Sequence, residues 1–346
     1  MSDPAIPLKS LRDAFPISER VNYINHAAMG PISRDVLAAV QKKAETQAFH
    51  HGEAIARFEP VYTACRAATA RLVGSRAERI AFIQNTSHGV SLLANGQAWR
   101  EGDDVIVSEM EFLSNFLPRL ALERQGVELR RMKLVDGRTT PEALSEIIDA
   151  RTRIVTLSQV QYFNGIRDDL AAISEITHAR GALLVVDGTQ SVGAVPIGGD
   201  AMGIGALVVS SHKWMLGPLG IGFMALSDEM LEWTRVTQLG WRSVNDPFAF
   251  NREIDLPDDA SRFEPGTVNA AGLFGLARRL EEIVAYTLSG IKSRILALTD
   301  RLADGVRANG FEIRSPMEPG ARSGILSLHR PDITNAATAD ALQGRG

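Results

Sequence analysis

Short apolar runs alternate with helix-like segments between residues 79 and 226. The runs are rich in β-branched residues and predict strands at 79–83, 104–108, 129–134, 153–157, 183–187, 206–210 and 221–226. A helix is predicted at 169–180, where apolar residues recur at helical spacing and Gly181 follows as a stop signal, and another begins at or near Ser87. This alternation is typical of βαβ units. It predicts an α/β fold, with a mostly parallel sheet and helices on both faces.

The pattern changes after residue 270. Two long helical stretches, 271–285 and 290–309, precede strand-like pieces at 311–314 and 325–328 and a last helix at 335–343. We therefore expect an N-terminal arm (1–20), a large α/β domain (21–270) and a smaller α+β domain (271–346). The chain stops directly after the last helix, so the smaller domain is expected to be incomplete.

The composition is that of an ordinary globular protein, with 346 residues, 45% hydrophobic residues, a net charge of -4 and a pI near 6.0. It lacks the clustered positive charge that nucleic-acid binding requires, so no nucleic-acid partner is expected. No apolar run has the length of a signal peptide or a membrane span, which makes a cytoplasmic location the default and excludes a membrane partner. The single cysteine, Cys65, allows no internal disulfide and no all-cysteine metal cage, and no metal site is predicted.

Cys65 lies in a helix-like stretch, where burial as a small apolar residue is favoured over catalysis.

Candidate chemistry follows two of the predicted strands. Thr86 and Ser87 stand where a strand gives way to a helix, and hydroxyls with free N–H groups at a helix N-terminus suit a phosphate, although a plain N-cap is the alternative. Asp187 ends a later strand. Its carboxylate could pair with the pyridinium nitrogen of a cofactor, or it could close an Asx-turn after the strand. Gln190, one turn further on, is placed to donate to a phenolic oxygen of such a cofactor.

The third candidate is Lys213, in the run Ser-Ser-His-Lys-Trp at 210–214. A deprotonated lysine amine forms a Schiff base with an aldehyde cofactor, whereas a lone lysine is usually a solvated charge. The conjunction of this lysine with Asp187 predicts pyridoxal phosphate (PLP) as the cofactor.

Four segments together carry a resemblance to a known family. They are Asp-Gly-Thr-Gln (187–190), Ser-Ser-His-Lys-Trp (210–214), Arg-Phe-Glu-Pro-Gly-Thr-Val-Asn (262–269) and Tyr-Ile-Asn-His-Ala-Ala-Met-Gly-Pro (23–31). The chain resembles class V aminotransferases, which are fold-type I PLP enzymes and include cysteine desulfurases and isopenicillin N epimerase-like proteins. The resemblance covers most of the chain, in the same order.

The resemblance implies a role for each matching residue. Lys213 would form the Schiff base, Asp187 would pair with the pyridine nitrogen and Gln190 would donate to the phenolic oxygen. Phe112 would stack on the cofactor ring. The phosphate would be bound by Thr86, Ser87, Ser210 and His212. Thr267 would reach the phosphate of a neighbouring subunit, which implies a homodimer with shared active sites.

Two departures from the family stand out. Tyr162 occupies a strand-end position where many desulfurase-like relatives have asparagine, and Asn164 is a possible substitute. The segment that carries the substrate-carboxylate arginine and the desulfurase cysteine in the family lies beyond the end of this sequence. Desulfuration through a protein persulfide is therefore not expected, and His26 and Arg242 are weak candidates for binding the substrate carboxylate.

Transamination of a small amino acid or amine is the main expectation for function. A lyase that eliminates a group such as a thiol, or an epimerase, uses the same electron sink and is the first alternative. The second alternative is a protein that keeps the cofactor fold without activity.

Overall fold

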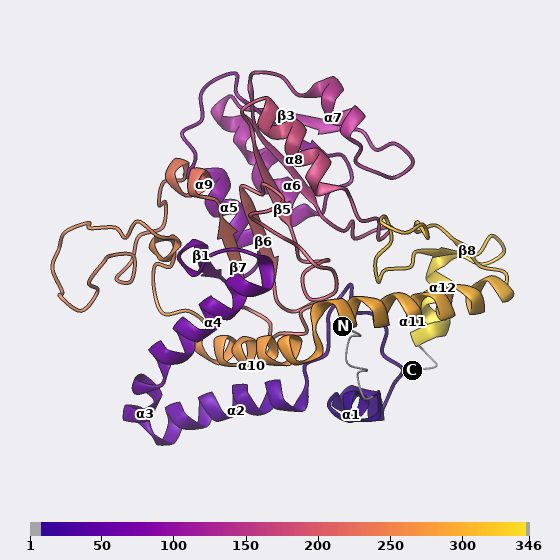
Figure 1. Cartoon of the computed structure of the whole chain (residues 1–346), viewed down its shortest axis with the longest axis horizontal. Coiled ribbons are helices and arrows are strands. Elements are labelled where there is room, and N and C mark those ends of the chain that lie inside the picture. Colours follow the sequence, from indigo (N-terminus) through magenta and orange to yellow (C-terminus); the bar gives the residue numbers. More distant parts are fainter. Residues whose placement is uncertain (1–7, 344–346) are drawn as a thin grey trace.

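A seven-stranded sheet forms the centre of the fold (Figure 1). The computed structural model describes residues 8–343. The strands are β1 (Ile80–Ile83), β2 (Asp104–Ser108), β3 (Glu128–Met132), β4 (Thr152–Ser158), β5 (Leu183–Asp187), β6 (Ala206–Ser210) and β7 (Gly222–Leu226). Their spatial order is β1-β7-β6-β5-β4-β2-β3, in which only the two pairs that include β7 are antiparallel. The mostly parallel sheet predicted from the sequence is confirmed, and each of the seven strands predicted between residues 79 and 226 is present within two residues of its expected bounds.

Helices cover both faces of the sheet, as predicted. The helices are α1 (Leu8–Asp13), α2 (Arg34–Phe49), α3 (His51–Ala56), α4 (Phe58–Val73), α5 (Thr86–Gly96), α6 (Leu113–Leu120), α7 (Pro141–Ile147), α8 (Leu170–Ala179), α9 (Asp228–Trp233), α10 (Ala270–Tyr286), α11 (Leu288–Ala308) and α12 (Asn335–Gln343). Helices α4, α7, α8 and α10 share one apolar core with the sheet, while α5 and α9 share the other. Strands buried on both faces are uniformly apolar, which explains the continuous hydrophobic runs in the sequence.

Polar N-caps set where the helices beside the site begin. The Asn85 side chain accepts a hydrogen bond from His88 N, so α5 starts at Thr86, next to the expected start at Ser87. Asp169 caps α8 in the same way. Both caps follow a strand end and direct the N-terminus of their helix toward the carboxyl edge of the sheet.

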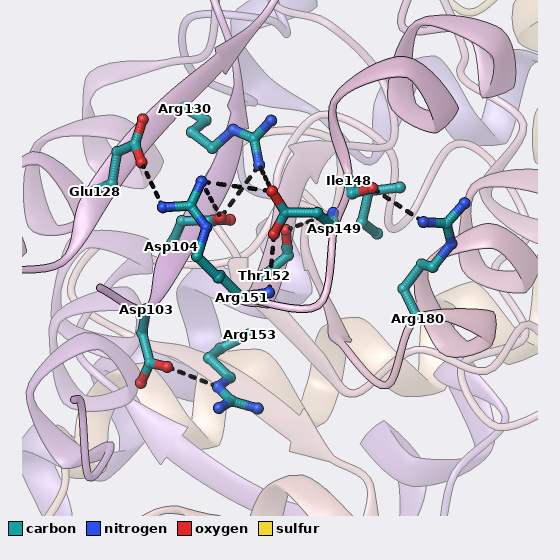
Figure 2. A network of polar contacts seen from close by, with 10 residues as sticks. All are labelled: Asp103, Asp104, Glu128, Arg130, Ile148, Asp149, Arg151, Thr152, Arg153 and Arg180. Atoms are coloured by element: carbon teal, nitrogen blue, oxygen red, sulfur yellow. Dashed lines mark hydrogen bonds and ion pairs between the residues drawn. The ribbon is translucent and has the colours of Figure 1, made fainter. Parts of the chain in front are cut away.

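A network of charges ties the strands together at the opposite, amino-terminal edge (Figure 2). Asp104, the first residue of β2, is fully buried and lies 3.2 Å from Arg130 of β3, whose guanidinium also contacts Asp149 at 2.9 Å. Asp103 pairs with Arg153 of β4 at 2.9 Å. Buried charges need partners, so these contacts favour one register of the three neighbouring strands and thereby place their carboxyl ends.

The C-terminal part contains α11, α12 and a two-stranded antiparallel sheet of β8 (Glu312–Ile313) and β9 (Leu328–His329). The helices expected there are present, whereas the strands are only two residues long. Helix α10 packs on α2 and α4 (Figure 1). The division into three parts stays a prediction, and residues 1–7 of the expected arm lie outside the described residues.

Three 3-10 helices complete the connections that matter here: η2 (Ala77–Arg79), η3 (Ala121–Gln125) and η4 (Ala260–Phe263). Within residues 8–343, no helix combines the length and apolarity needed to cross a membrane.

Candidate active site

Three polar residues end three neighbouring strands at the carboxyl edge of the sheet. Ser158 of β4 lies opposite Asp187 of β5 in the parallel register, and β6 ends at Ser210 beside them. All three are buried. In open α/β sheets, ligands bind outside the carboxyl ends of the strands, so this edge is the candidate active site.

Asp187 and Lys213 form the charged centre of the site. Asp187 Oδ1 accepts a hydrogen bond from Thr189 N at 2.9 Å. Burial raises the pKa of Asp187, while the bonds from Thr189 and the positive charge of Lys213 oppose that rise. Burial also lowers the pKa of Lys213, against the attraction of Asp187. The site thus holds a carboxylate together with an amine that loses its proton more easily than an exposed lysine, as a lysine nucleophile requires.

The N-terminal segment lies directly on the loop that carries Lys213. Gly30 N donates a hydrogen bond to the carbonyl of His212 at 2.7 Å. A Cβ atom at Gly30 would lie 2.1 Å from the carbonyl oxygen of Lys213, so only glycine allows this approach. The contact explains why the motif at 23–31 belongs to the site although it is far from Lys213 in the sequence.

A cluster of hydroxyls lies at the N-terminus of α5. The Thr86 hydroxyl is 2.7 Å from that of Thr189 and 2.8 Å from that of Ser210, and Ser210 Oγ accepts from Thr86 N at 2.8 Å. The structure therefore brings Thr86 and Ser210 together, as expected for a phosphate site. Thr189 was missed, although its segment carries the resemblance, because its side chain meets the others only in the fold.

Two further phosphate candidates border this cluster. The Ser87 hydroxyl donates to Ser114 Oγ at 2.8 Å. Burial and the charge of Lys213 both lower the pKa of His212, which favours its neutral form. Their phosphate contacts stay predictions.

Gln190 has two protein partners in this structure. Its Nε2 donates to the carbonyl of Ala27 at 3.0 Å, and its Oε1 accepts from Trp214 Nε1 at 2.9 Å. His26 stacks on Trp214, with 5.5 Å between the ring centroids, and burial lowers the pKa of His26. Donation by Gln190 to a phenolic oxygen stays a prediction, and it requires sharing or release of the Ala27 contact.

Aromatic rings form one side of the site. The Phe112 ring lies 5.1 Å from Lys213 Nζ, and Tyr162 meets Phe112 edge to face at 5.2 Å. Asn164, the possible substitute for the family asparagine, instead donates to the Gly137 carbonyl and accepts from Ile166 N. Tyr162 is therefore the residue of this segment that faces the aromatic side of the site.

Arg242 and Thr267 lie apart from these contacts. Arg242 pairs with Glu59 at 2.8 Å, and its guanidinium lies over the ring of Tyr62. Thr267 is exposed. Within residues 8–343, no hydrogen bond or ion pair joins either residue to Lys213 or Asp187. Their roles toward substrate and partner phosphate stay predictions.

Cys65 is buried in the core between α4 and the sheet, as expected. Burial raises the pKa of its thiol to about 12. A thiol in this environment stays protonated and is a poor nucleophile. The part of the chain that the structure describes contains no cluster of three or more metal-ligating side chains.

Glu111 is the main site residue that the sequence did not reveal. It is buried, and it precedes Phe112 directly. Burial raises its pKa to about 7, and the neighbouring charge of Asp187 adds to that rise. The only signal in the sequence is an acidic residue just after a buried strand, which is too common to single out.

The donor set fits PLP. An amine with a lowered pKa, a buried carboxylate, an aromatic ring and a hydroxyl cluster at a helix N-terminus match the aldehyde, the ring nitrogen, the ring face and the phosphate of this cofactor.

Two curated relatives are similar over most of the chain. A probable cysteine desulfurase of Methanothermobacter thermautotrophicus is 31% identical over 266 residues, which cover 76% of this chain and 66% of that protein. A cysteine desulfurase of Klebsiella pneumoniae is 30% identical over 352 residues, which cover 93% of this chain and 82% of that protein. The chain thus spans about two thirds to four fifths of these relatives.

Solved structures show the same fold. An apo cysteine desulfurase from Thermococcus onnurineus NA1 has a TM-score of 0.89 and 23% identity, and the match covers 99% of this chain and 87% of that one. The cystine C-S lyase C-DES in complex with its reaction product cysteine persulfide has a TM-score of 0.88 and 20% identity, with coverage of 96% and 90%.

The family model for aminotransferase class-V matches residues 22–346. The match includes Asp187 and Lys213 and extends through the described C-terminal part. The chain therefore belongs to the class V aminotransferase family, whose cofactor is pyridoxal phosphate.

Proposed function

We propose that this protein cleaves the carbon–sulfur bond of a small sulfur-containing amino acid with the aid of PLP. The observation that carries the proposal is the pairing of a buried Asp187 with a Lys213 of lowered pKa at the carboxyl edge of the sheet. The relatives named as cysteine desulfurases and the C-S lyase fold neighbour favour this chemistry over transamination. The sequence-based expectation of transamination is retained as the alternative.

PLP, when bound, supplies an electron sink for breaking bonds at the α-carbon of an amino acid. The side chains of this protein bind the cofactor, provide a counter-charge and transfer the proton. Lys213 would bind the cofactor aldehyde, and its amine would hold or release a proton at Nζ, because its lowered pKa makes both forms accessible. Asp187 holds a negative charge where the ring nitrogen needs a counter-charge. Thr86 and Ser210 would donate to the phosphate.

Cys65 does not accept the sulfur in this proposal. Its thiol is buried and has a pKa of about 12, so it is a poor nucleophile. The sulfur is instead released from the protein as a small molecule. With L-cysteine as the substrate, L-cysteine and water would give pyruvate, ammonia and hydrogen sulfide.

We also infer a homodimer. The segment between α9 and η4 extends away from the sheet (Figure 1), and its side chains Phe248, Phe250 and Ile254 are 63%, 84% and 71% exposed. Exposed apolar clusters are typical of interaction surfaces. If Thr267 completes the neighbouring site, mixing inactive T267A and K213A subunits restores some activity in hybrid dimers. Activity in the mixture no higher than the sum of the two parents would contradict this inference.

A panel of amino acids without any oxo-acid acceptor tests the proposed reaction. The PLP-loaded protein is incubated with L-cysteine, L-cystine and L-alanine, while sulfide, persulfide, pyruvate and pyridoxamine phosphate are measured. We expect repeated turnover with a sulfur substrate, lost in K213A and kept in C65A. Stoichiometric pyridoxamine phosphate with L-alanine and no sulfur release would instead support transamination. Bound PLP with no reaction would support the fold without activity.

A further inference from the structure

Glu111 connects two parts of the candidate active site. Its Oε1 accepts a hydrogen bond from Phe112 N at 2.8 Å, and its Oε2 accepts from Ser158 N at 2.6 Å. The Ser158 hydroxyl also donates to Oε1. One buried carboxyl group therefore joins the start of α6, which follows β2, to the end of β4.

Each end of this connection lies next to a residue with a proposed role. Phe112 is the N-cap position of α6, and its ring lies over the Lys213 amine. Ser158 lies directly opposite Asp187 in the parallel register, and Gln159 N donates to the Asp187 carbonyl at 3.2 Å. A displacement of Glu111 would thus shift both Phe112, on the aromatic side of the site, and the end of β4 beside Asp187.

We propose that Glu111 is a positioning residue, which fixes Phe112 over Lys213 and holds the end of β4 beside Asp187. The proposal rests on PLP binding at Lys213, as inferred above. Its contact with Ser158 N is short and buried, and its contact with Phe112 N is part-buried, so water does not readily replace the first of these bonds.

The charges around Glu111 agree with this role. Burial raises the pKa of Glu111, and the charge of Asp187 adds to that rise, while the bonds from Ser158 and Phe112 oppose it. Burial also raises the pKa of Asp168, and Glu111 in turn adds to that rise. With a pKa of about 7, caused mainly by burial, Glu111 retains its proton more readily than an exposed glutamate.

Glu109 provides a matched control two residues earlier. Its carboxylate also accepts a backbone hydrogen bond, from Leu134 N at 2.8 Å, but this residue is exposed. E109A and E111A both remove an acid and a backbone contact from the same loop. Only E111A removes the connection between Phe112 and Ser158.

The test measures the dissociation constant (Kd) of PLP by quenching of tryptophan fluorescence, together with the absorption band of bound PLP. Wild type, E111A, E111Q and E109A are compared at a temperature at which near-ultraviolet circular dichroism shows each apo-protein to be folded. Glutamine keeps one of the two backbone acceptors, because its amide nitrogen cannot accept the second N–H. E111Q is therefore expected to recover part of what E111A loses.

We expect the Kd to rise about tenfold in E111A, about threefold in E111Q and less than about twofold in E109A. The band of bound PLP is expected to change in E111A alone among the alanine variants. A Kd and band in E111A equal to those of E109A would overturn the proposal, as would E111Q binding as weakly as E111A. If E111A does not fold, a Kd in E111Q equal to that of wild type overturns it. Absence of PLP binding by wild type would refute the proposed function instead.

Discussion

The Lys213 amine lies 5.1 Å from the centroid of the Phe112 ring, although the two residues belong to different connections of the sheet. A ring at this distance leaves a flat aromatic face beside the amine that binds the cofactor aldehyde. The fold thus places a stacking surface and a nucleophile on the same site.

Replacing Phe112 tests the value of that surface. F112L keeps an apolar side chain but removes the aromatic face, so we expect the Kd of PLP to rise about fivefold, corresponding to about 1 kcal/mol. F112W keeps an aromatic face and should bind within about twofold of wild type. Fluorescence titration measures both, and equal Kd values for F112L and F112W would contradict a stacking role.

Asp187→Asn tests the negative charge of Asp187, because asparagine has nearly the same shape but carries no charge. Asparagine keeps an oxygen to accept from Thr189 N, but it provides no counter-charge for the cofactor nitrogen. We expect turnover to fall by about 10²-fold or more, because the electron sink is weakened. The apo-protein should stay folded, because asparagine has nearly the same shape and keeps the acceptor for Thr189 N, which near-ultraviolet circular dichroism checks. Turnover close to that of wild type would refute the role of Asp187.

Thr86→Val probes the hydroxyl cluster at the N-terminus of α5. Valine has nearly the same shape but donates no hydrogen bond, so the affinity for PLP should fall about tenfold. Pyridoxal, which has no phosphate, provides the control ligand, and its affinity should stay the same. Equal losses for PLP and pyridoxal would place Thr86 away from the phosphate.

The stability of the apo-protein should depend on pH through Asp168. Burial raises the pKa of Asp168 from 3.8 to about 7, so between these values the folded state keeps a proton that the unfolded chain has lost. The free energy of unfolding should therefore fall as the pH rises from 4 to 8, by on the order of a few kcal/mol, because each pKa unit corresponds to about 1.4 kcal/mol.

D168N should flatten this dependence. Asparagine keeps an acceptor for Thr139 N and has no titrating proton, so the slope that remains is expected to come mainly from Glu111, whose pKa is also raised to about 7. Urea unfolding at pH 5 and pH 8 measures both proteins. A loss of stability with pH that is identical in D168N and wild type would contradict this assignment.

The sheet was predictable from the sequence because the strands other than β3 are largely apolar runs buried on both faces, whereas β3 lies at an edge and is partly exposed. β2, β5 and β6 match their expected bounds residue for residue. The position of Asp187 and Lys213 at one edge of the sheet was also predictable, because Asp187 ends one such run and Lys213 lies three residues after another. Their roles toward PLP stay predictions. The short strands β8 and β9 were overestimated, since two paired residues leave no clear pattern.

Contacts made only in the folded chain could not be predicted. Glu111 reaches Ser158 across 47 residues of sequence, and Thr189 reaches Thr86 across 103. Asn164 uses its amide on the backbone of its own loop, which a motif comparison does not show. Strand register determines these contacts, and register depends on the whole sheet.

Covalent trapping of PLP on the protein tests the central claim most directly. The PLP-loaded protein is reduced with borohydride, digested and analysed by mass spectrometry, with K213A treated in parallel. We predict a single phosphopyridoxyl group on the peptide that contains Lys213 and none in K213A. A label on another lysine, or bound PLP that never becomes attached to Lys213, would contradict the account.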